Sequence, residues 1–391
     1  MFSSRLPRDF QPNRLAGALA AKRREGAAIL DLTESNPTRA GFAYPPEIVR
    51  AFEDPGILRY HPAPAGRREA REAVAAYYAA RGQRVEPERI LLTASTSEAY
   101  SYLFKLLANP GDHVLVPRPS YPLFECLASL EALEVRAYPL AYHGRWSIDF
   151  DALAGALTDR TRAVIVVNPN NPTGNYLKRA EWEVLARLCG ARGIAVIADE
   201  VFSDYAFGPD PDRVTTLAGA EDCLTFSLSG LSKIAGLPQM KLGWIAVAGP
   251  AALRADAWER LEWIADAYLS VATPVQCAAA RLLIAGESVQ RQIRARTAEN
   301  LQFGHQTLAG SCATPLAVEA GWYLVLQVPR VRTGEEWTLE LLLQWDTLVQ
   351  PGYFYDFEAE AFLVVSLLTD PVIFQEGLAR LARFLAEPSV K

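Results

Sequence analysis

The sequence has few residues that hold metals or form disulfides, with five cysteines and four histidines among 391 residues. The cysteines are odd in number, widely spaced and without a C-x-x-C pair. We therefore expect free, mostly buried thiols in a reducing compartment and no disulfide framework. The histidines are scattered as well, so we expect no metal site.

Long apolar runs and an excess of positive charge are also missing. No run approaches the roughly 20 apolar residues that cross a bilayer, so we expect no membrane partner. The start, MFSSRLPRDF, lacks the apolar centre of a secretory signal, and we expect a cytoplasmic protein, with a transit peptide as the alternative because Arg and Ser occur early. The net charge of −6 gives no basic surface for a nucleic acid partner. The length is sufficient for two globular domains.

Two stretches combine the pattern of a buried strand with polar residues at its end. AVIVVNPNNPTG (163–174), and the region from IAVIADEVF to SLSGLSK (194–233), each contain an apolar, β-branched run typical of buried parallel strands. Because ligands bind beyond the carboxyl ends of such strands, we expect Asn171, Asp199 and Lys233 to converge on one crevice. An amine can form a Schiff base with an aldehyde, a carboxylate can hold a pyridinium nitrogen protonated, and an amide can bond a phenolic oxygen.

The order NPNNPTG, then DEVF, then SLSGLSK resembles the pyridoxal-phosphate-dependent aminotransferases of classes I and II, which have fold type I. The resemblance runs along nearly the whole chain. It implies an α/β fold, with a large domain built on a mostly parallel central sheet flanked by helices. It also implies a smaller α+β domain formed by the N-terminal segment and the C-terminal third. We place the large domain at residues 46–288 and the small domain at 1–45 and 289–391.

The resemblance implies roles for the residues at the strand ends. Lys233 is expected to hold pyridoxal 5'-phosphate as an internal aldimine and then to act as the general base at the α-carbon of the substrate. Asp199 is expected to keep the ring nitrogen protonated, Asn171 to bond the phenolic oxygen, and Tyr121 to stack on the ring. The alternatives are structural: a solvated lysine, a loop-capping carboxylate, a turn and a packed aromatic ring.

The implied phosphate ligands come from several segments. The turn Ser95-Thr96-Ser97 precedes a predicted helix, where N–H groups and hydroxyls bind anions, although an ordinary helix cap explains it too. The other implied ligands are Ser229, Lys241 and, for the neighbouring subunit, Tyr60. The resemblance implies a homodimer, because active sites of the family borrow residues across the subunit interface.

Three positions near the cofactor depart from the family pattern. Phe202 stands where a Tyr usually shares the phenolic oxygen, so we predict a raised pKa of the internal aldimine, unless Tyr205 supplies the hydroxyl. Lys241 replaces an Arg and keeps its charge without the bidentate fork. Gly230 replaces a Ser, for which the adjacent Ser229 can substitute.

A fourth departure concerns the substrate. In FLVVSLL, Val364 stands where the family has the Arg that clamps the substrate carboxylate, and valine cannot make that contact. Either another residue holds the carboxylate, with Arg39, Arg330 and Arg332 as candidates by location, or the substrate is not a simple α-amino acid. In the N-terminal segment, Ser35 stands where a Gly is usual.

Three functions remain in competition. The first is an aminotransferase acting between an amino acid or related amine as donor and a keto acid as acceptor. The second is another pyridoxal-phosphate enzyme on the same scaffold, namely a lyase, decarboxylase, racemase or cyclase. The third is a catalytically silent protein of the same fold used for binding or regulation, which the presence of Lys233 and Asp199 argues against.

Overall fold

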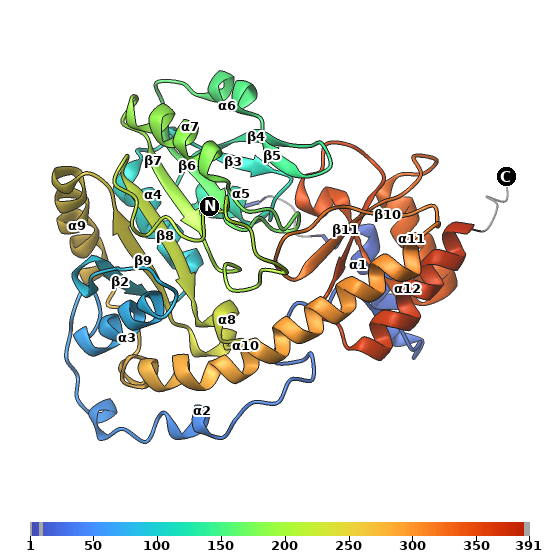
Figure 1. Ribbon diagram of the computed structural model, residues 1–391, viewed down its shortest axis with the longest axis horizontal. Helices are drawn as coiled ribbons and strands as arrows, with labels where there is room; N and C mark the ends of the chain where they lie inside the picture. The colour runs from blue at the N-terminus through green and yellow to red at the C-terminus, as the bar shows by residue number, and fades with distance from the viewer. Residues whose placement is uncertain (1, 8–10, 387–391) are drawn as a thin grey trace.

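The computed structural model describes residues 2–7 and 11–386, and in this part of the chain the largest element is an eight-stranded sheet (Figure 1). Its strands are β2 (Ile90–Thr93), β3 (His113–Arg118), β4 (Glu134–Tyr142), β5 (Trp146–Ile148), β6 (Thr161–Val167), β7 (Ala195–Asp199), β8 (Thr225–Gly230) and β9 (Gly243–Ala248). Their order is β2-β9-β8-β7-β6-β3-β4-β5. The pairs from β8 to β4 are parallel, whereas β9, β2 and β5 are joined by antiparallel pairs.

Both faces of this sheet are covered, which explains the uninterrupted apolar runs of its central strands. Ile165 and Ile197 pack toward one set of helices, and their neighbours Val164 and Val196 pack toward the other. The first set is α4 (Thr96–Leu107), α5 (Leu123–Leu130) and α9 (Ala251–Asp266), and the second includes α3 (Arg68–Ala79), α6 (Phe150–Ala156) and α7 (Arg179–Gly190). The predicted α/β architecture is thereby confirmed.

A smaller lobe contains an antiparallel sheet with the order β10-β11-β14-β13 (Figure 1). Its elements are β10 (Thr314–Pro315), β11 (Tyr323–Gln327), β13 (Gln350–Pro351), β14 (Phe362–Ser366), α11 (Gly334–Trp345) and α12 (Pro371–Ala386). The N-terminal segment joins this lobe, because β1 (Leu30–Asp31) pairs in parallel with β12 (Thr347–Leu348), and α1 (Arg14–Arg24) packs its Leu15 against α11.

One helix, α10 (Thr273–Leu308), belongs to both lobes. Its first half packs on α3 and its second half on α12, as Figure 1 shows in orange. The predicted boundary at 288/289 falls inside this continuous helix, and the domain limits stay a prediction. The short elements are α2 (Glu47–Arg50), α8 (Leu231–Ile234) and the 3-10 helices η1 (Pro55–Leu58), η2 (Pro87–Arg89), η3 (Pro238–Met240) and η4 (Gly352–Tyr355).

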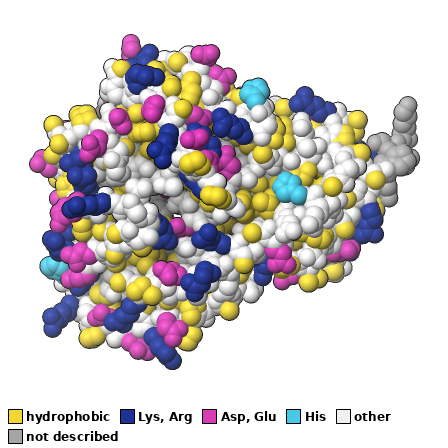
Figure 2. Space-filling model, viewed as in Figure 1, with side chains coloured by type: hydrophobic (Ala, Val, Ile, Leu, Met, Phe, Trp, Pro, Cys, Tyr) yellow, Lys and Arg dark blue, Asp and Glu magenta, His cyan; other side chains and the backbone are white. Residues whose placement is uncertain are grey.

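The cysteines and the surface bear on the composition arguments. All five cysteines are free, as expected, but only Cys189 and Cys223 are buried, so the expectation of mostly buried thiols was wrong. Figure 2 shows Lys and Arg side chains mixed with Asp and Glu over the visible face, without a broad area of one sign. Among the described residues, no helix has both the length and the apolar character required to cross a membrane.

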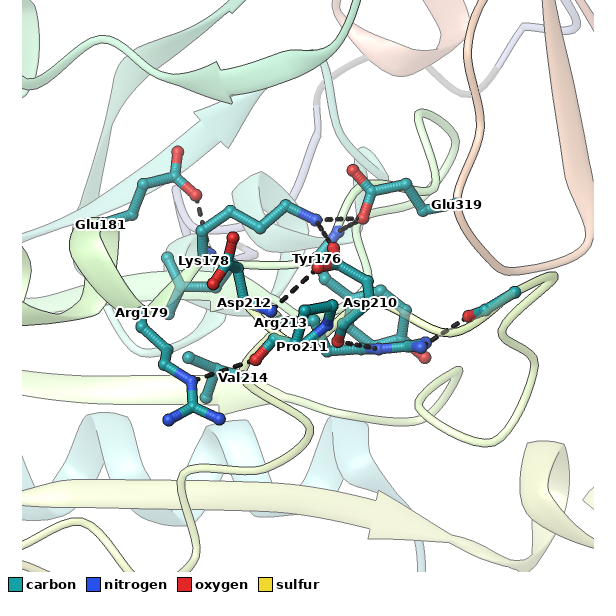
Figure 3. A network of polar contacts seen from close by, with 12 residues as sticks. Tyr176, Lys178, Arg179, Glu181, Asp210, Pro211, Asp212, Arg213, Val214 and Glu319 are labelled. Atoms are coloured by element: carbon teal, nitrogen blue, oxygen red, sulfur yellow. Dashed lines mark hydrogen bonds and ion pairs between the residues drawn. The ribbon is translucent and has the colours of Figure 1, made fainter.

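A polar network around Lys178 ties the segment before β11 to the large lobe (Figure 3). The Lys178 side chain is 10% exposed, and its Nζ lies 2.6 Å from Asp210 Oδ2 and also pairs with Glu319. The backbone continues the connection, because Phe207 N donates to Glu319 O at 2.9 Å. One buried cation therefore serves two carboxylates on different segments.

Replacing Lys178 with Met is expected to lower the free energy of unfolding by about 2 kcal/mol, because two partly buried carboxylates would lose their counter-ion. Their side chains are 31% and 28% exposed, which keeps the expected loss below that of a fully buried pair. Urea denaturation at pH 7 measures it. The control is Arg260→Met, which breaks an exposed pair with Asp256 and should cost less than about 0.5 kcal/mol. Equal losses in the two variants would contradict a special role for the network.

Candidate active site

The structure brings Asn171, Asp199 and Lys233 to the carboxyl edge of three adjacent strands. Asn171 lies in the turn after β6, Asp199 ends β7, and Lys233 lies in α8, directly after β8. The first two segments are joined by the backbone, since Asn168 N donates to Asp199 O at 2.8 Å. The charges of Asp199 and Lys233 influence each other's pKa, so both groups belong to one site.

Asp199 is partly buried and held by two hydrogen bonds. Tyr100 donates its hydroxyl to Oδ2 at 3.1 Å, and Val201 N donates to Oδ1 at 3.3 Å. Burial raises the pKa of Asp199 from 3.8 to about 6, although these hydrogen bonds and Lys233 act in the opposite direction. A nearby cation would favour the ionised form of this carboxyl group and lower its pKa again.

Lys233 is an amine in aromatic surroundings. Its Nζ lies 5.3 Å from the ring centre of Trp322 and 5.9 Å from that of Phe202. Burial lowers the pKa of Lys233, and the charge of Asp199 opposes that shift. A lowered pKa increases the neutral, nucleophilic fraction of the amine, as Schiff-base chemistry requires.

An aromatic wall extends from Lys233 toward the smaller lobe. The Phe202 ring packs edge-on against Trp322, with centres 5.1 Å apart, and against Tyr323 at 6.4 Å. Tyr323 in turn contacts Tyr355 at 6.0 Å. The Tyr205 hydroxyl donates to the backbone oxygen of Lys233, so it is already committed and does not replace the hydroxyl missing at Phe202.

The Ser-Thr turn caps α4 and lies beside the turn that carries Lys241. Ser95 is the N-cap residue, and its Oγ accepts a hydrogen bond from Glu98 N at 3.2 Å. Helix geometry leaves the N–H groups of Thr96 and Ser97 without an intrahelical acceptor. A Cβ on Gly243 would come within 3.2 Å of the Ser95 carbonyl carbon, so the segment that carries the exposed Lys241 lies close by. These residues can together receive an anion.

Ser229 shares a face of β8 with Ser227, and its expected role in place of the Ser that is usual at Gly230 stays a prediction. It pairs with Trp244, and Ser227 hydrogen-bonds Glu200. Its Oγ has no hydrogen-bond partner among the described residues, and it lines a cavity of about 130 Å³ beside Glu200. Gly230 itself leaves no room for a Ser, because a Cβ there would lie 2.9 Å from Leu242 O.

The two predicted tyrosines differ in position. Tyr121, 47% exposed, lies close enough to Tyr323 and Tyr355 to affect the pKa of both, so it stands at the aromatic wall. Tyr60 is 78% exposed and borders a shallow pocket with Ser270. Within one chain, Tyr60 is a surface residue.

No candidate arginine is seen to replace the missing carboxylate clamp. Val364 is fully buried opposite Val325 in the smaller sheet. Arg332 pairs with Glu340 at 3.0 Å and stacks on Trp337, so it is already committed. Arg39 and Arg330 are exposed, and the described residues show no side-chain contact from either to the Lys233 cluster.

Several site residues were missed by the sequence reasoning. Tyr100 in α4, Trp322 directly before β11 and Tyr323 at its start were not singled out from the sequence. For Tyr100 a signal existed, because it stands four residues after Thr96 and so shares its helix face. For Trp322 and Tyr323 no local pattern indicates contact with Lys233.

An open α/β sheet that carries a desolvated lysine beside a shielded carboxylate at its carboxyl edge is a scaffold suited to Schiff-base chemistry with a bound aldehyde. The sequence model of the family described as aminotransferase class I and II matches residues 27–373. The chain therefore belongs to the class I and II aminotransferase family. Members of this family use pyridoxal phosphate.

Curated relatives agree with this membership. Glutamate-pyruvate aminotransferase AlaA of Escherichia coli K12 is 30% identical over 254 residues, which cover 64% of this chain and 62% of that protein. AlaA of Haemophilus influenzae is 26% identical, with 93% of this chain and 92% of that protein covered. The alignment with the first relative thus spans less than two thirds of its length.

Solved structures share the fold at lower identity. An aminotransferase from Escherichia coli superposes with a TM-score of 0.86 at 24% identity, covering 99% of this chain and 98% of that one. Alanine aminotransferase from Pyrococcus furiosus gives a TM-score of 0.86 at 22% identity, with 97% and 100% covered. At this identity the likeness establishes the fold.

Proposed function

We propose that this chain is a pyridoxal-phosphate-dependent aminotransferase that transfers an amino group between an amino acid, or a related amine, and a keto acid. The observation that carries the proposal is the desolvated Lys233 amine held in one site with Asp199 at the carboxyl edge of the sheet. The relatives named glutamate-pyruvate aminotransferase and tyrosine aminotransferase support the same reaction type.

The residues present fit the cofactor. The Asn171 side chain makes no hydrogen bond to the described residues, and its Oδ1 is buried, so its Nδ2 donor is free for the phenolic oxygen of the cofactor. An unpaired buried polar atom is costly unless a ligand or water satisfies it. When bound, pyridoxal phosphate supplies an aldehyde for the amine and a ring that withdraws electrons from the α-carbon of the substrate.

The protein groups then have distinct tasks. Lys233 provides the amine and, once displaced, moves the proton at the α-carbon of the substrate. Asp199 stabilises a protonated ring nitrogen, Asn171 bonds the phenolic oxygen, and Tyr121 covers a face of the ring. The aromatic wall around Phe202 excludes water from the amine.

The phosphate would be held by Ser95, Thr96, Ser97 and Lys241. Tyr60 is exposed and therefore available to a second copy of the chain, so we propose a homodimer in which Tyr60 reaches the neighbouring phosphate. We place the enzyme in the cytoplasm, with a small amino donor and a keto acid acceptor as its partners.

A second function stays open because of one observation. Val364 leaves the usual carboxylate clamp unfilled, and the surrounding Tyr323 and Ser35 offer hydroxyl groups without a positive charge. A lyase, decarboxylase, racemase or cyclase on the same scaffold would also tolerate this change. Under the first function, an amino donor with a neutral group in place of the carboxylate would suit a site without the arginine clamp.

A half-reaction screen tests the proposal. Purified protein loaded with pyridoxal phosphate is mixed in turn with amino acids and with amines that lack a carboxylate, and the absorbance of the cofactor is followed. Conversion of the cofactor to its amino form, reversed by a keto acid, is expected with at least one donor. Cofactor absorbance that never converts to the amino form, while a donor is decarboxylated, racemised or eliminated, would favour the second function.

Restoring the usual aromatic residue is expected to change the titration of the bound cofactor. In Phe202→Tyr, a new hydroxyl can donate to the phenolic oxygen and stabilise its charged form, so the absorbance of the bound cofactor should titrate at lower pH by about one unit. A spectral titration from pH 5 to 10 measures this. The matched control is Phe207→Tyr, a partly buried ring farther along the same loop, which should leave the midpoint unchanged. An unchanged midpoint in Phe202→Tyr would contradict the assignment.

A further inference from the structure

The turn that carries Lys233 receives hydrogen bonds from three distant segments. The hydroxyl of Tyr205 donates to Lys233 O, Nε2 of Gln290 donates to Ile234 O at 2.7 Å, and the hydroxyl of Tyr44 donates to Gly236 O at 2.7 Å. Helix α8 has only four residues and offers few backbone donors: Gly236 N donates to Lys233 O at 3.2 Å, and side chains supply the other hydrogen bonds to the carbonyl groups at and just beyond its end. Side chains from elsewhere therefore fix the backbone around the amine.

Gln290 donates to two acceptors from one side-chain nitrogen. It is 8% exposed, and its Nε2 also donates to Asp204 Oδ2 at 2.8 Å. Asp204 is fixed in turn by the Tyr77 hydroxyl at 2.8 Å and by Arg81 Nε at 2.6 Å. Because Asp204 is fixed, the Gln290 amide has one orientation in which Nε2 donates to both acceptors. This orientation fixes the position of the Ile234 carbonyl group.

The helix that bears Gln290 also touches the turn with almost no side chain between them. A Cβ on Gly286 of α10 would lie 2.4 Å from the Ala235 Cβ, and a Cβ on Gly236 would lie 2.8 Å from Val289 Cγ1. The two glycines permit this approach because they lack a side chain. The same helix continues into the smaller lobe, where Asn300 donates to two carbonyl oxygens.

We propose that Gln290 is a positioning residue for Lys233, which joins the amine-bearing turn to α10 and thereby to the smaller lobe. It acts through the backbone at Ile234 and touches neither substrate nor cofactor. Its catalytic consequence rests on the proposed function, but the backbone connection does not. A shift of α10 would move the amine relative to Asp199, which is held separately by Tyr100.

A pair of matched variants tests the proposal. Gln290→Leu and Asn300→Leu each remove a buried amide of α10 that donates to two oxygens, but only the first contacts the Lys233 turn. Hydrogen exchange of the cofactor-free protein, read by mass spectrometry in the peptide 231–242, should rise about tenfold in Gln290→Leu. It should stay unchanged in Asn300→Leu. Equal exchange in both variants would overturn the proposal.

Kinetics of the loaded enzyme give the second readout. Gln290→Leu should lower kcat about tenfold with KM nearly constant, because the amine is misplaced while substrate contacts persist. Loss of stability with unchanged kcat would mark Gln290 as merely structural and overturn the proposal. If no donor converts the cofactor, the proposed function fails, and the exchange result still decides the backbone connection. If Gln290→Leu does not fold, Gln290→Met keeps the length of the side chain without the amide and must raise the exchange, and unchanged exchange in that variant would overturn the proposal.

Discussion

Replacing Lys233 with alanine is expected to abolish the Schiff-base absorbance of the cofactor-loaded protein and to reduce kcat/KM at least about 10⁴-fold. The same amine is proposed to bind the aldehyde and to move the α-proton, so both tasks are lost in one substitution. The cavity left is bordered by Trp322 and Phe202, which offer no nucleophile. Borohydride reduction of the loaded wild-type protein should attach the cofactor mass to a peptide that contains residue 233.

The control for this experiment is Lys105→Ala. Lys105 lies in α4 and pairs with Glu131 away from the Lys233 cluster, so its loss should leave the cofactor absorbance and the mass tag unchanged. A tag on another lysine, or an unchanged Schiff-base absorbance in Lys233→Ala, would refute the assignment of the amine. Both outcomes are read without any knowledge of the amino donor.

The position of the site at the carboxyl ends of the central strands could be predicted from the sequence for a physical reason. Parallel strands buried on both faces need unbroken apolar runs, and the first polar residue after each run marks the edge where ligands bind. That reasoning placed the segments of Asn171, Asp199 and Lys233 at one edge of the sheet. The roles of these three residues came from the resemblance to the aminotransferase family.

The aromatic wall could not be predicted in this way. Trp322 and Tyr323 occur in a pattern that indicates a strand, but the pattern does not state which sheet the strand joins or what its side chains face. The surroundings of Ser229 are a related case. Alternation places Ser227 and Ser229 on one face of the strand, but only the three-dimensional structure shows that Glu200 hydrogen-bonds Ser227 on that face.

Replacing Asp199 with Asn is expected to lower kcat by about 10²- to 10³-fold, the usual effect of removing one preorganised electrostatic group. Asparagine keeps the size of the side chain: its oxygen can still accept from Val201 N, and its Nδ2 can donate to the Tyr100 hydroxyl, so the main change is the loss of the charge. The unprotonated ring would then withdraw fewer electrons from the substrate. Normal kcat in Asp199→Asn would remove the proposed role of this carboxylate.

The same variant should be more stable than the wild type in the cofactor-free state, and the sign follows from the pKa. Burial raises the folded pKa of Asp199 to about 6, so its ionised form is disfavoured by about 3 kcal/mol at most. The free energy of unfolding of the wild type therefore falls as the pH rises from about 4 through 6, because the folded state resists ionisation of Asp199. The asparagine side chain of the variant cannot ionise and shows no such fall. Urea denaturation at pH 4 should therefore show little difference, and at pH 7.5 the variant should lead. Glu200, whose pKa is raised to about 7, titrates in both proteins and largely cancels in the difference. A difference in the free energy of unfolding that widens toward low pH would contradict a destabilising buried charge at Asp199. The expected difference would mean that Asp199 is kept for chemistry at a cost in stability.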